Sequence, residues 1–119
     1  MRIDVIVEPS LSADDVIELG QLAERYGFGA IWMPNKLDGK DPFISFGVLA
    51  RETKTIKMGP IAVSPFELHP IKMAASLLTL NEISGGRAVI VVGGGGGTVD
   101  AMGLKPEKRM PAMRECIDI

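Results

Sequence analysis

Four short apolar segments begin near residues 3, 30, 57 and 88 of this 119-residue chain. A helix-like pattern of apolar residues follows each of the first three, and no hairpin turn separates neighbouring segments. A spacing of about 30 residues is the length of one strand–helix unit. Strands that alternate with helices form parallel sheets joined by right-handed crossovers. The spacing therefore predicts an α/β chain with four parallel strands.

The ends of these elements carry recognisable signals. We expect strands over residues 3–7, 30–33, 56–63 and 88–92. Ser12, Asp41 and His69 stand where helix N-caps belong, and proline follows the last two at the first helical position. Gly27 ends the first helix, and a Gly-Gly pair at 85–86 ends the third. A last helix is expected to start near Pro106 and to continue to the end of the sequence.

Two architectures fit such a pattern, a doubly wound sheet and a (β/α)8 barrel. A barrel needs about 250 residues, so four strands would make about half of one. No linker, low-complexity segment or change of composition divides the sequence. We therefore expect residues 1–119 to form a single partial domain.

Composition limits the classes of partner. Thirteen Lys and Arg residues stand against fifteen Asp and Glu, a net charge of −2, so no basic surface for nucleic acid or anionic lipid is expected. No apolar run approaches the about 20 residues that span a bilayer. Cys116 is the only cysteine and cannot close an internal disulfide, which favours a reducing, cytoplasmic setting. A small-molecule ligand remains as the expected partner.

A run of five glycines, residues 93–97, directly follows the fourth predicted strand. Glycine lets the backbone approach a ligand closely. A dinucleotide fingerprint is disfavoured because Thr98 replaces its third glycine, and the Lys-Ser/Thr of a phosphate-binding P-loop is missing. The run is compatible with a ligand-facing loop and equally with a loop that binds nothing.

Polar residues follow the other predicted strands, at the end where active sites of α/β barrels gather. They are Glu8, Asn35, Lys36, Ser64 and Glu67. Each is compatible with ligand contact and also with an exposed turn. His69 is the only histidine and is better explained as a helix cap, so a metal site is not expected.

Four segments together resemble a known family: LAERYGF at 22–28, TIKMGP at 55–60, LNEISGGR at 80–87 and DAMG at 100–103. In order and spacing they are similar to the luciferase-like superfamily of flavin and deazaflavin barrels. Within it, the sequence resembles the methylenetetrahydromethanopterin reductases, and the resemblance covers the whole chain as the N-terminal part of a longer protein. It implies a TIM-barrel fold, of which these residues form about half.

The resemblance also implies a coenzyme, F420 or, in other branches, FMN, bound at the C-terminal mouth of the barrel. Members carry a non-prolyl cis peptide behind the coenzyme ring, and the matching bond is Ile61–Ala62. The implied coenzyme contacts fall into three groups. Ile61, Ala62 and Val63 would lie behind the ring, Gly93, Gly94 and Gly95 would leave room for it, and Asn35 and Lys36 would touch its polar edge.

Three functions follow from this resemblance. The first is hydride transfer from reduced F420 to a methylene-tetrahydropterin substrate, for which no catalytic side chain is assigned. The second is an FMN-dependent monooxygenase of the same fold. The third, a non-catalytic fragment or assembly module, is favoured by the differences from the family pattern. Asn35 and Lys36 replace an Asp-His pair, Gly96 and Ile6 replace carboxylates, and Ile61 replaces a small residue.

The resemblance further implies a homodimer, because the family associates through helices of its N-terminal half. Apolar residues on the second and third predicted helices allow such an interface. We expect Phe43, Phe46, Ile71 and Leu78 to contribute to it.

Overall fold

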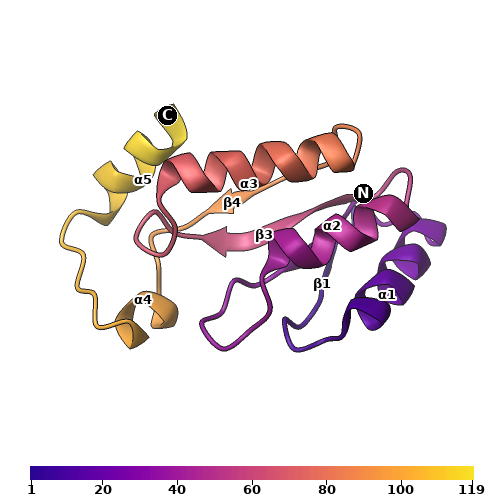
Figure 1. Cartoon of the computed structure of the whole chain (residues 1–119), viewed down its shortest axis with the longest axis horizontal. Helices are drawn as coiled ribbons and strands as arrows, with labels where there is room; N and C mark the ends of the chain where they lie inside the picture. Colours follow the sequence, from indigo (N-terminus) through magenta and orange to yellow (C-terminus); the bar gives the residue numbers. More distant parts are fainter.

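Strands and helices alternate along the chain, as the spacing of its apolar segments predicts (Figure 1). The computed structural model describes all residues from 1 to 119. In chain order the elements are β1 (Val5–Ile6), α1 (Ala13–Arg25), β2 (Ala30–Met33), α2 (Pro42–Glu52), β3 (Lys57–Val63), α3 (Pro70–Ile83), β4 (Val91–Val92), α4 (Gly97–Ala101) and α5 (Arg109–Asp118). None of the helices combines the length and apolar character that crossing a membrane requires.

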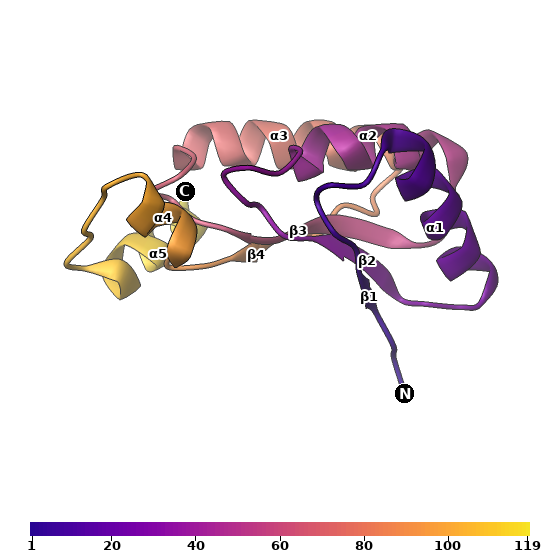
Figure 2. The ribbon, with the colours of Figure 1, turned by 90° about the horizontal axis from the view of Figure 1, so that it is seen from below.

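The sheet is parallel, and its spatial order β1-β2-β3-β4 repeats the order of the chain. Figure 2 shows α1, α2 and α3 on one face of this sheet. A doubly wound sheet reverses its strand order and carries helices on both faces, whereas a barrel keeps sequential order with its helices outside. The chain is therefore an arc of a TIM-type barrel, which confirms the predicted fold class.

The three predicted N-caps are confirmed. Ser12 Oγ accepts a hydrogen bond from the Asp15 backbone N–H at 3.1 Å. Asp41 Oδ1 accepts from the Ile44 N–H at 2.9 Å, and His69 Nδ1 accepts from the N–H of Ile71 at 3.2 Å. These caps satisfy N–H groups that a helix leaves free at its start. They fix where α1, α2 and α3 begin.

The core lies between the helices and the face of the sheet that they cover. Its largest fully buried side chains include Phe46, Ile31 and Met33. Helices α1 and α2 pack so closely that a Cβ at Gly20 would collide with the side chain of Leu49. Burying apolar side chains in this layer supplies the main stabilising term of such a fold.

Two strands are shorter than the sequence predicts. The first, expected over 3–7 and buried on both faces, spans only Val5–Ile6, and Ile6 is 59% exposed. The expectation of two buried faces is wrong here because helices cover only one face of the sheet. The fourth, expected over 88–92, spans Val91–Val92, with Ala88 joined to Met58 by an isolated bridge. The β3–β4 register is irregular, which interrupts the ladder between these points.

The C-terminal quarter also differs from expectation. Helix α4 starts at Gly97, inside the glycine run, and the last helix starts at Arg109 rather than near Pro106. Helix α4 has no side-chain cap, and its one buried residue is Val99. A helix of a single turn anchored by one side chain gives no periodic signal in the sequence.

Glu24 ties α1 to the start of β3. Its carboxylate accepts hydrogen bonds from the backbone N–H groups of Lys54, Thr55 and Ile56, at 2.9, 2.7 and 2.9 Å. Burial by itself would raise the pKa of Glu24, but the three backbone donors favour the charged form, and the pKa lies below its ordinary value of 4.5. The Glu24 carboxylate therefore holds the backbone just before β3 in place against α1.

We expect Glu24→Gln to lower the free energy of unfolding by about 2 kcal/mol at pH 7, since hydrogen bonds to a charged acceptor are worth about 1.5–3 kcal/mol. The folded-state pKa is depressed, so this stabilisation is present above the unfolded-state pKa and is lost as the pH falls through the folded-state value. Urea titrations at pH 7 and pH 3 should show the gap between wild type and variant closing in acid. The exposed Glu18→Gln serves as control; an equal gap at both pH values would contradict the role of the charge.

Candidate functional site

A cavity of about 330 Å³ lies at the C-terminal ends of β2, β3 and β4. Its size falls within the about 300–1,000 Å³ range of small-molecule sites. Six of the eight predicted coenzyme contacts line it: Asn35, Ala62, Val63, Gly93, Gly94 and Gly95. The remaining lining residues are Ser64, Glu67, Gly96, Gly97 and Thr98. The fold thus brings together residues from three separate loops.

Backbone rather than side chains forms the wall on the glycine side. Gly93 continues the sheet, donating its N–H to the Val63 carbonyl at 2.9 Å. A Cβ at Gly93 would lie 3.0 Å from the Cβ of Ala62, so a side chain there would narrow the cavity. Gly95 has a φ of 78°, which favours glycine, and a Cβ there would collide with Val99. The glycine run therefore leaves this wall of the cavity without side chains.

Ile61 and Lys36 do not line this cavity. Ile61 is paired with Val91 in the sheet, and the peptide bond from Ile61 to Ala62 is cis, as the resemblance implies. Lys36 is exposed and its Nζ lies 3.4 Å from Glu8 Oε2. It borders a neighbouring hollow of about 550 Å³ that adjoins the cavity at Gly97 and Thr98. Contact of Lys36 with a ligand therefore requires one that extends beyond the cavity.

Three polar residues that line the cavity, Asn35, Ser64 and Glu67, are joined by hydrogen bonds. Asn35 Nδ2 donates to Glu67 Oε2 at 2.9 Å, and the Ser64 backbone N–H lies 3.4 Å from the same oxygen. Ser64 is 2% exposed, and its hydroxyl accepts from the Phe66 N–H at 3.2 Å. The position of Ser64 and Glu67 after β3 marked them as candidates, but nothing in the sequence linked Glu67 to Asn35.

The contact of Arg109 with the glycine run was not predicted from the sequence. Its Nη1 donates to the carbonyl oxygen of Gly95 at 2.6 Å, and its Nη2 lies 3.6 Å from Asp100 Oδ1. The Arg109 side chain thereby joins the first turn of α5 to the glycine run. Fourteen residues separate the partners, with no periodicity to signal the contact.

His69 and Cys116 lie outside the cavity. His69 caps α3, as predicted. Cys116 lies half-buried in α5 with its Sγ 3.9 Å from Met73 Sδ, and burial raises the pKa of its thiol. A protonated, packed thiol is a poor nucleophile, in line with the reading of Cys116 as a packing residue.

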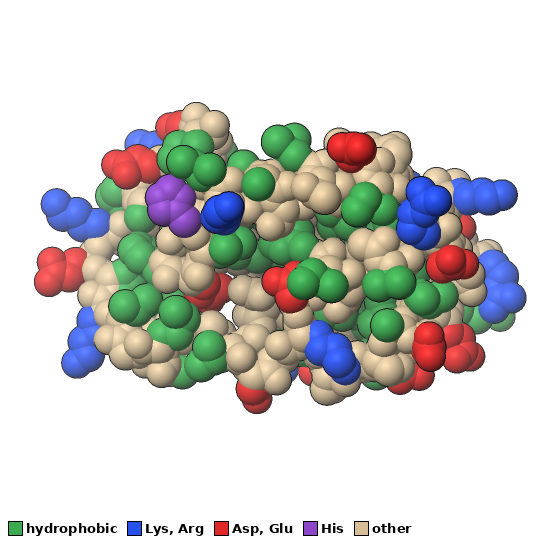
Figure 3. Space-filling view, viewed as in Figure 1, with side chains coloured by type: hydrophobic (Ala, Val, Ile, Leu, Met, Phe, Trp, Pro, Cys, Tyr) green, Lys and Arg blue, Asp and Glu red, His purple; other side chains and the backbone are tan.

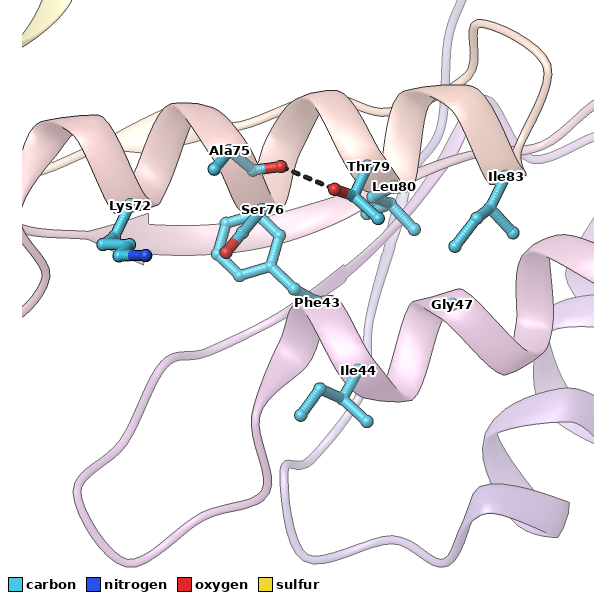
Figure 4. A pocket seen from close by; sticks show the side chains of 9 residues that line it. All are labelled: Phe43, Ile44, Gly47, Lys72, Ala75, Ser76, Thr79, Leu80 and Ile83. Atoms are coloured by element: carbon cyan, nitrogen blue, oxygen red, sulfur yellow. Dashed lines mark hydrogen bonds between the residues drawn. The ribbon is translucent and has the colours of Figure 1, made fainter.

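A separate groove of about 490 Å³ lies between α2 and α3 on the helical face. Figure 4 shows Phe43 of α2 reaching toward α3 in this groove. Figure 3 shows hydrophobic side chains spread over this face, including over α2 and α3, with charged side chains among them and at the margins. Ile71 and Leu78 are exposed, but Phe46 is fully buried in the core. The assignment of Phe46 to an interface is therefore wrong, because its side chain faces the sheet.

Comparison with known proteins agrees with the arc of barrel. Residues 2–119 match the family described as luciferase-like monooxygenase. The 5,10-methylenetetrahydromethanopterin reductase of Archaeoglobus fulgidus is 32% identical over 120 residues, which cover 100% of this chain and 36% of that protein. The oxygenase component of a flavin-dependent trigonelline monooxygenase from Acinetobacter baylyi is 39% identical over 80 residues, 62% of this chain and 22% of that protein.

A solved structure of a related protein superposes on the same arc of barrel. The coenzyme F420 dependent tetrahydromethanopterin reductase from Methanopyrus kandleri superposes with a TM-score of 0.83 at 31% identity, covering 87% of this chain and 30% of that chain. The chain thus spans about a third of the length of the reductases it matches.

Proposed function

The chain belongs to the luciferase-like monooxygenase family, and we propose that it forms the N-terminal arc of an F420-dependent oxidoreductase. The proposed reaction is hydride transfer between reduced deazaflavin and a methylene-tetrahydropterin-type substrate. The observation that carries the proposal is the backbone-walled cavity at the strand ends. Two reductases similar over most or all of the chain, one of them described as F420-dependent, support the choice of coenzyme.

The residues present fit a flat heterocyclic ring. Ala62 and Gly93 lie side by side on one wall and keep it free of bulk, and Gly95 provides a turn that a side chain would obstruct. Asn35 and Glu67 supply hydrogen-bonding groups at the edge. The bound coenzyme would supply the hydride, and the protein groups would bind and orient the ring and exclude water. No side chain of this chain is assigned a proton-transfer step.

Binding of the coenzyme to the purified chain tests this proposal. Wild type should quench F420 fluorescence on titration, and Ala62→Leu should raise the Kd about 10- to 100-fold, because overfilling a packed site costs about 1–3 kcal/mol. Ala13→Leu, at an exposed position in the first turn of α1, should leave the Kd unchanged. An unaltered Kd in Ala62→Leu would place the ring elsewhere.

An FMN-dependent monooxygenase is the second candidate, and similarity to a flavin-dependent oxygenase component favours it. Reduced flavin reacts readily with oxygen, whereas a reduced deazaflavin reacts poorly. Parallel titrations with FMN and F420, followed by oxygen consumption after reduction, separate the two. Failure to bind either coenzyme at high micromolar concentration would support the third candidate, a non-catalytic module.

The groove between α2 and α3 is also the place where we propose that two copies associate. Ile44 lines this groove and is 75% exposed. Sedimentation velocity at tens of micromolar should detect a dimer, and Ile44→Glu should shift it toward monomer by placing a charge in an apolar contact. Sedimentation of wild type as a monomer throughout that range would rule the interface out.

A further inference from the structure

Glu67 has one carboxylate oxygen engaged and one free. Its Oε2 accepts hydrogen bonds from Asn35 Nδ2 at 2.9 Å and from the Ser64 N–H at 3.4 Å. No protein donor reaches Oε1, and no Lys or Arg pairs with the carboxylate; Lys36 pairs with Glu8 instead. Glu67 is half-buried and lines the cavity. An ionised carboxylate only accepts hydrogen bonds, so Oε1 is available to accept one from a donor group of a ligand.

The neighbouring amide supplies the opposite chemistry. Asn35 has two N–H groups, and one of them is committed to Glu67. The second remains available beside the carboxylate. An acceptor and a donor side by side match a ring in which an N–H stands next to a carbonyl. Most of the other lining residues are glycines or apolar residues, which offer no comparable pair of side chains.

We propose that Glu67, positioned by Asn35 and Ser64, is the specificity residue that selects a heterocycle carrying a lactam or imide N–H. The proposal rests on the proposed function, because it assigns a role within the same cavity. Flavins and deazaflavins carry such an N–H between two carbonyls, and pterins carry one beside a single carbonyl. The ring N–H donates to Glu67, and its adjacent carbonyl accepts from Asn35.

Glu67→Gln is a sharp test because it is nearly isosteric. The donors on Asn35 and Ser64 hold the glutamine with its amide oxygen toward them. The amide NH2 then takes the place of Oε1 and presents a donor where the ligand also presents one. We expect the variant to lose its preference for N–H rings while melting at the wild-type temperature.

Paired ring compounds provide the readout. One arm compares lumiflavin with 3-methyllumiflavin, and the other compares 6-methylpterin with its N3-methyl derivative, by fluorescence titration of the whole chain. Wild type should bind the N–H ring about 10-fold or more tightly than its N-methyl partner in at least one arm, the scale of a hydrogen bond to a charged group. The arm that shows the preference tells whether coenzyme or substrate supplies the donor. The control Glu82→Gln, exposed on α3, should behave as wild type.

The outcomes separate the two levels of the proposal. Loss of the N–H preference in Glu67→Gln alone supports the selector role. An N–H preference that persists in Glu67→Gln, or wild-type binding with no preference in either arm, overturns that role and leaves the proposed function standing. Failure of wild type to bind any of the four rings and both coenzymes overturns both.

Discussion

Gly59→Ala should prevent β3 and β4 from pairing and should cost at least about 3 kcal/mol of unfolding free energy. A Cβ at this position would fall on the carbonyl oxygen of Val89, a backbone atom that no rotamer change can move. The preceding residue makes two hydrogen bonds, Met58 N–H to Arg87 O at 3.1 Å and Val89 N–H to Met58 O at 2.9 Å, which hold the two segments at that distance. Urea unfolding followed by circular dichroism measures the loss.

Gly47→Ala is the matched control for this change. Gly47 lies inside α2, and a Cβ there meets nothing within 4 Å. Alanine should therefore stabilise the protein by about 0.5–1 kcal/mol through its better helix propensity. Opposite signs for the two glycine substitutions are expected; equal, small effects would mean that β4 can shift away from β3 at little cost.

Arg87→Ala is expected to cost about 3 kcal/mol. The guanidinium donates to the carbonyl oxygens of Ala50, Thr53, Ile56 and Ser84, at 2.8, 3.1, 3.0 and 2.6 Å, and to the Thr53 hydroxyl at 2.9 Å. It thereby joins the ends of α2 and α3 to the start of β3. Removing it leaves the carbonyl groups of several buried residues without this donor, and each lost hydrogen bond costs free energy. Burial lowers the pKa of Arg87, while Glu24 acts to raise it.

Two further variants of the same type sharpen that experiment. Arg87→Lys should recover little, because an ammonium on a flexible stem cannot reproduce a planar set of donors. Arg51→Ala, in the exposed last turn of α2, should change stability by less than about 0.5 kcal/mol. Denaturant midpoints of the three proteins measure these effects. A midpoint for Arg87→Ala equal to that for Arg51→Ala would refute the bracing role.

Local signals in the sequence were enough to predict most of the fold. Ser12, Asp41 and His69 were readable as caps because a cap needs only its own side chain and a nearby N–H. The alternation of elements then selected a parallel sheet. Its barrel form came from the family resemblance, and sequential strand order with helices on one face confirms it.

Contacts between distant segments could not be read in the same way. Asn35 meets Glu67 across 32 residues, and Arg109 reaches Gly95 across 14. Phe46 looked as available for an interface as Phe43, because periodicity gives the spacing of a helical stripe and not which partner each residue meets. Ile6 looked buried because its neighbours are apolar, although one face of its strand lacks a covering layer.

The segments that carry the family resemblance have mostly structural roles. Glu24 belongs to the first segment, Gly59 to the second and Arg87 to the third. Glu24 and Arg87 hydrogen-bond backbone groups at the start of β3, and Gly59 lets β3 approach Val89 closely. Contacts of this kind specify a barrel without specifying a substrate. Such contacts are compatible with the similarity of one chain to both a reductase and an oxygenase component.

Glu24 and Arg87 anchor one end of the strands, and the cavity opens at the other. The demands of folding and of ligand recognition thus fall on different side chains. Laboratory evolution could randomise Asn35, Glu67 and Thr98 together without prior stabilising mutations. Most members of such a library should still fold, so that a screen would report differences in ligand binding rather than differences in stability.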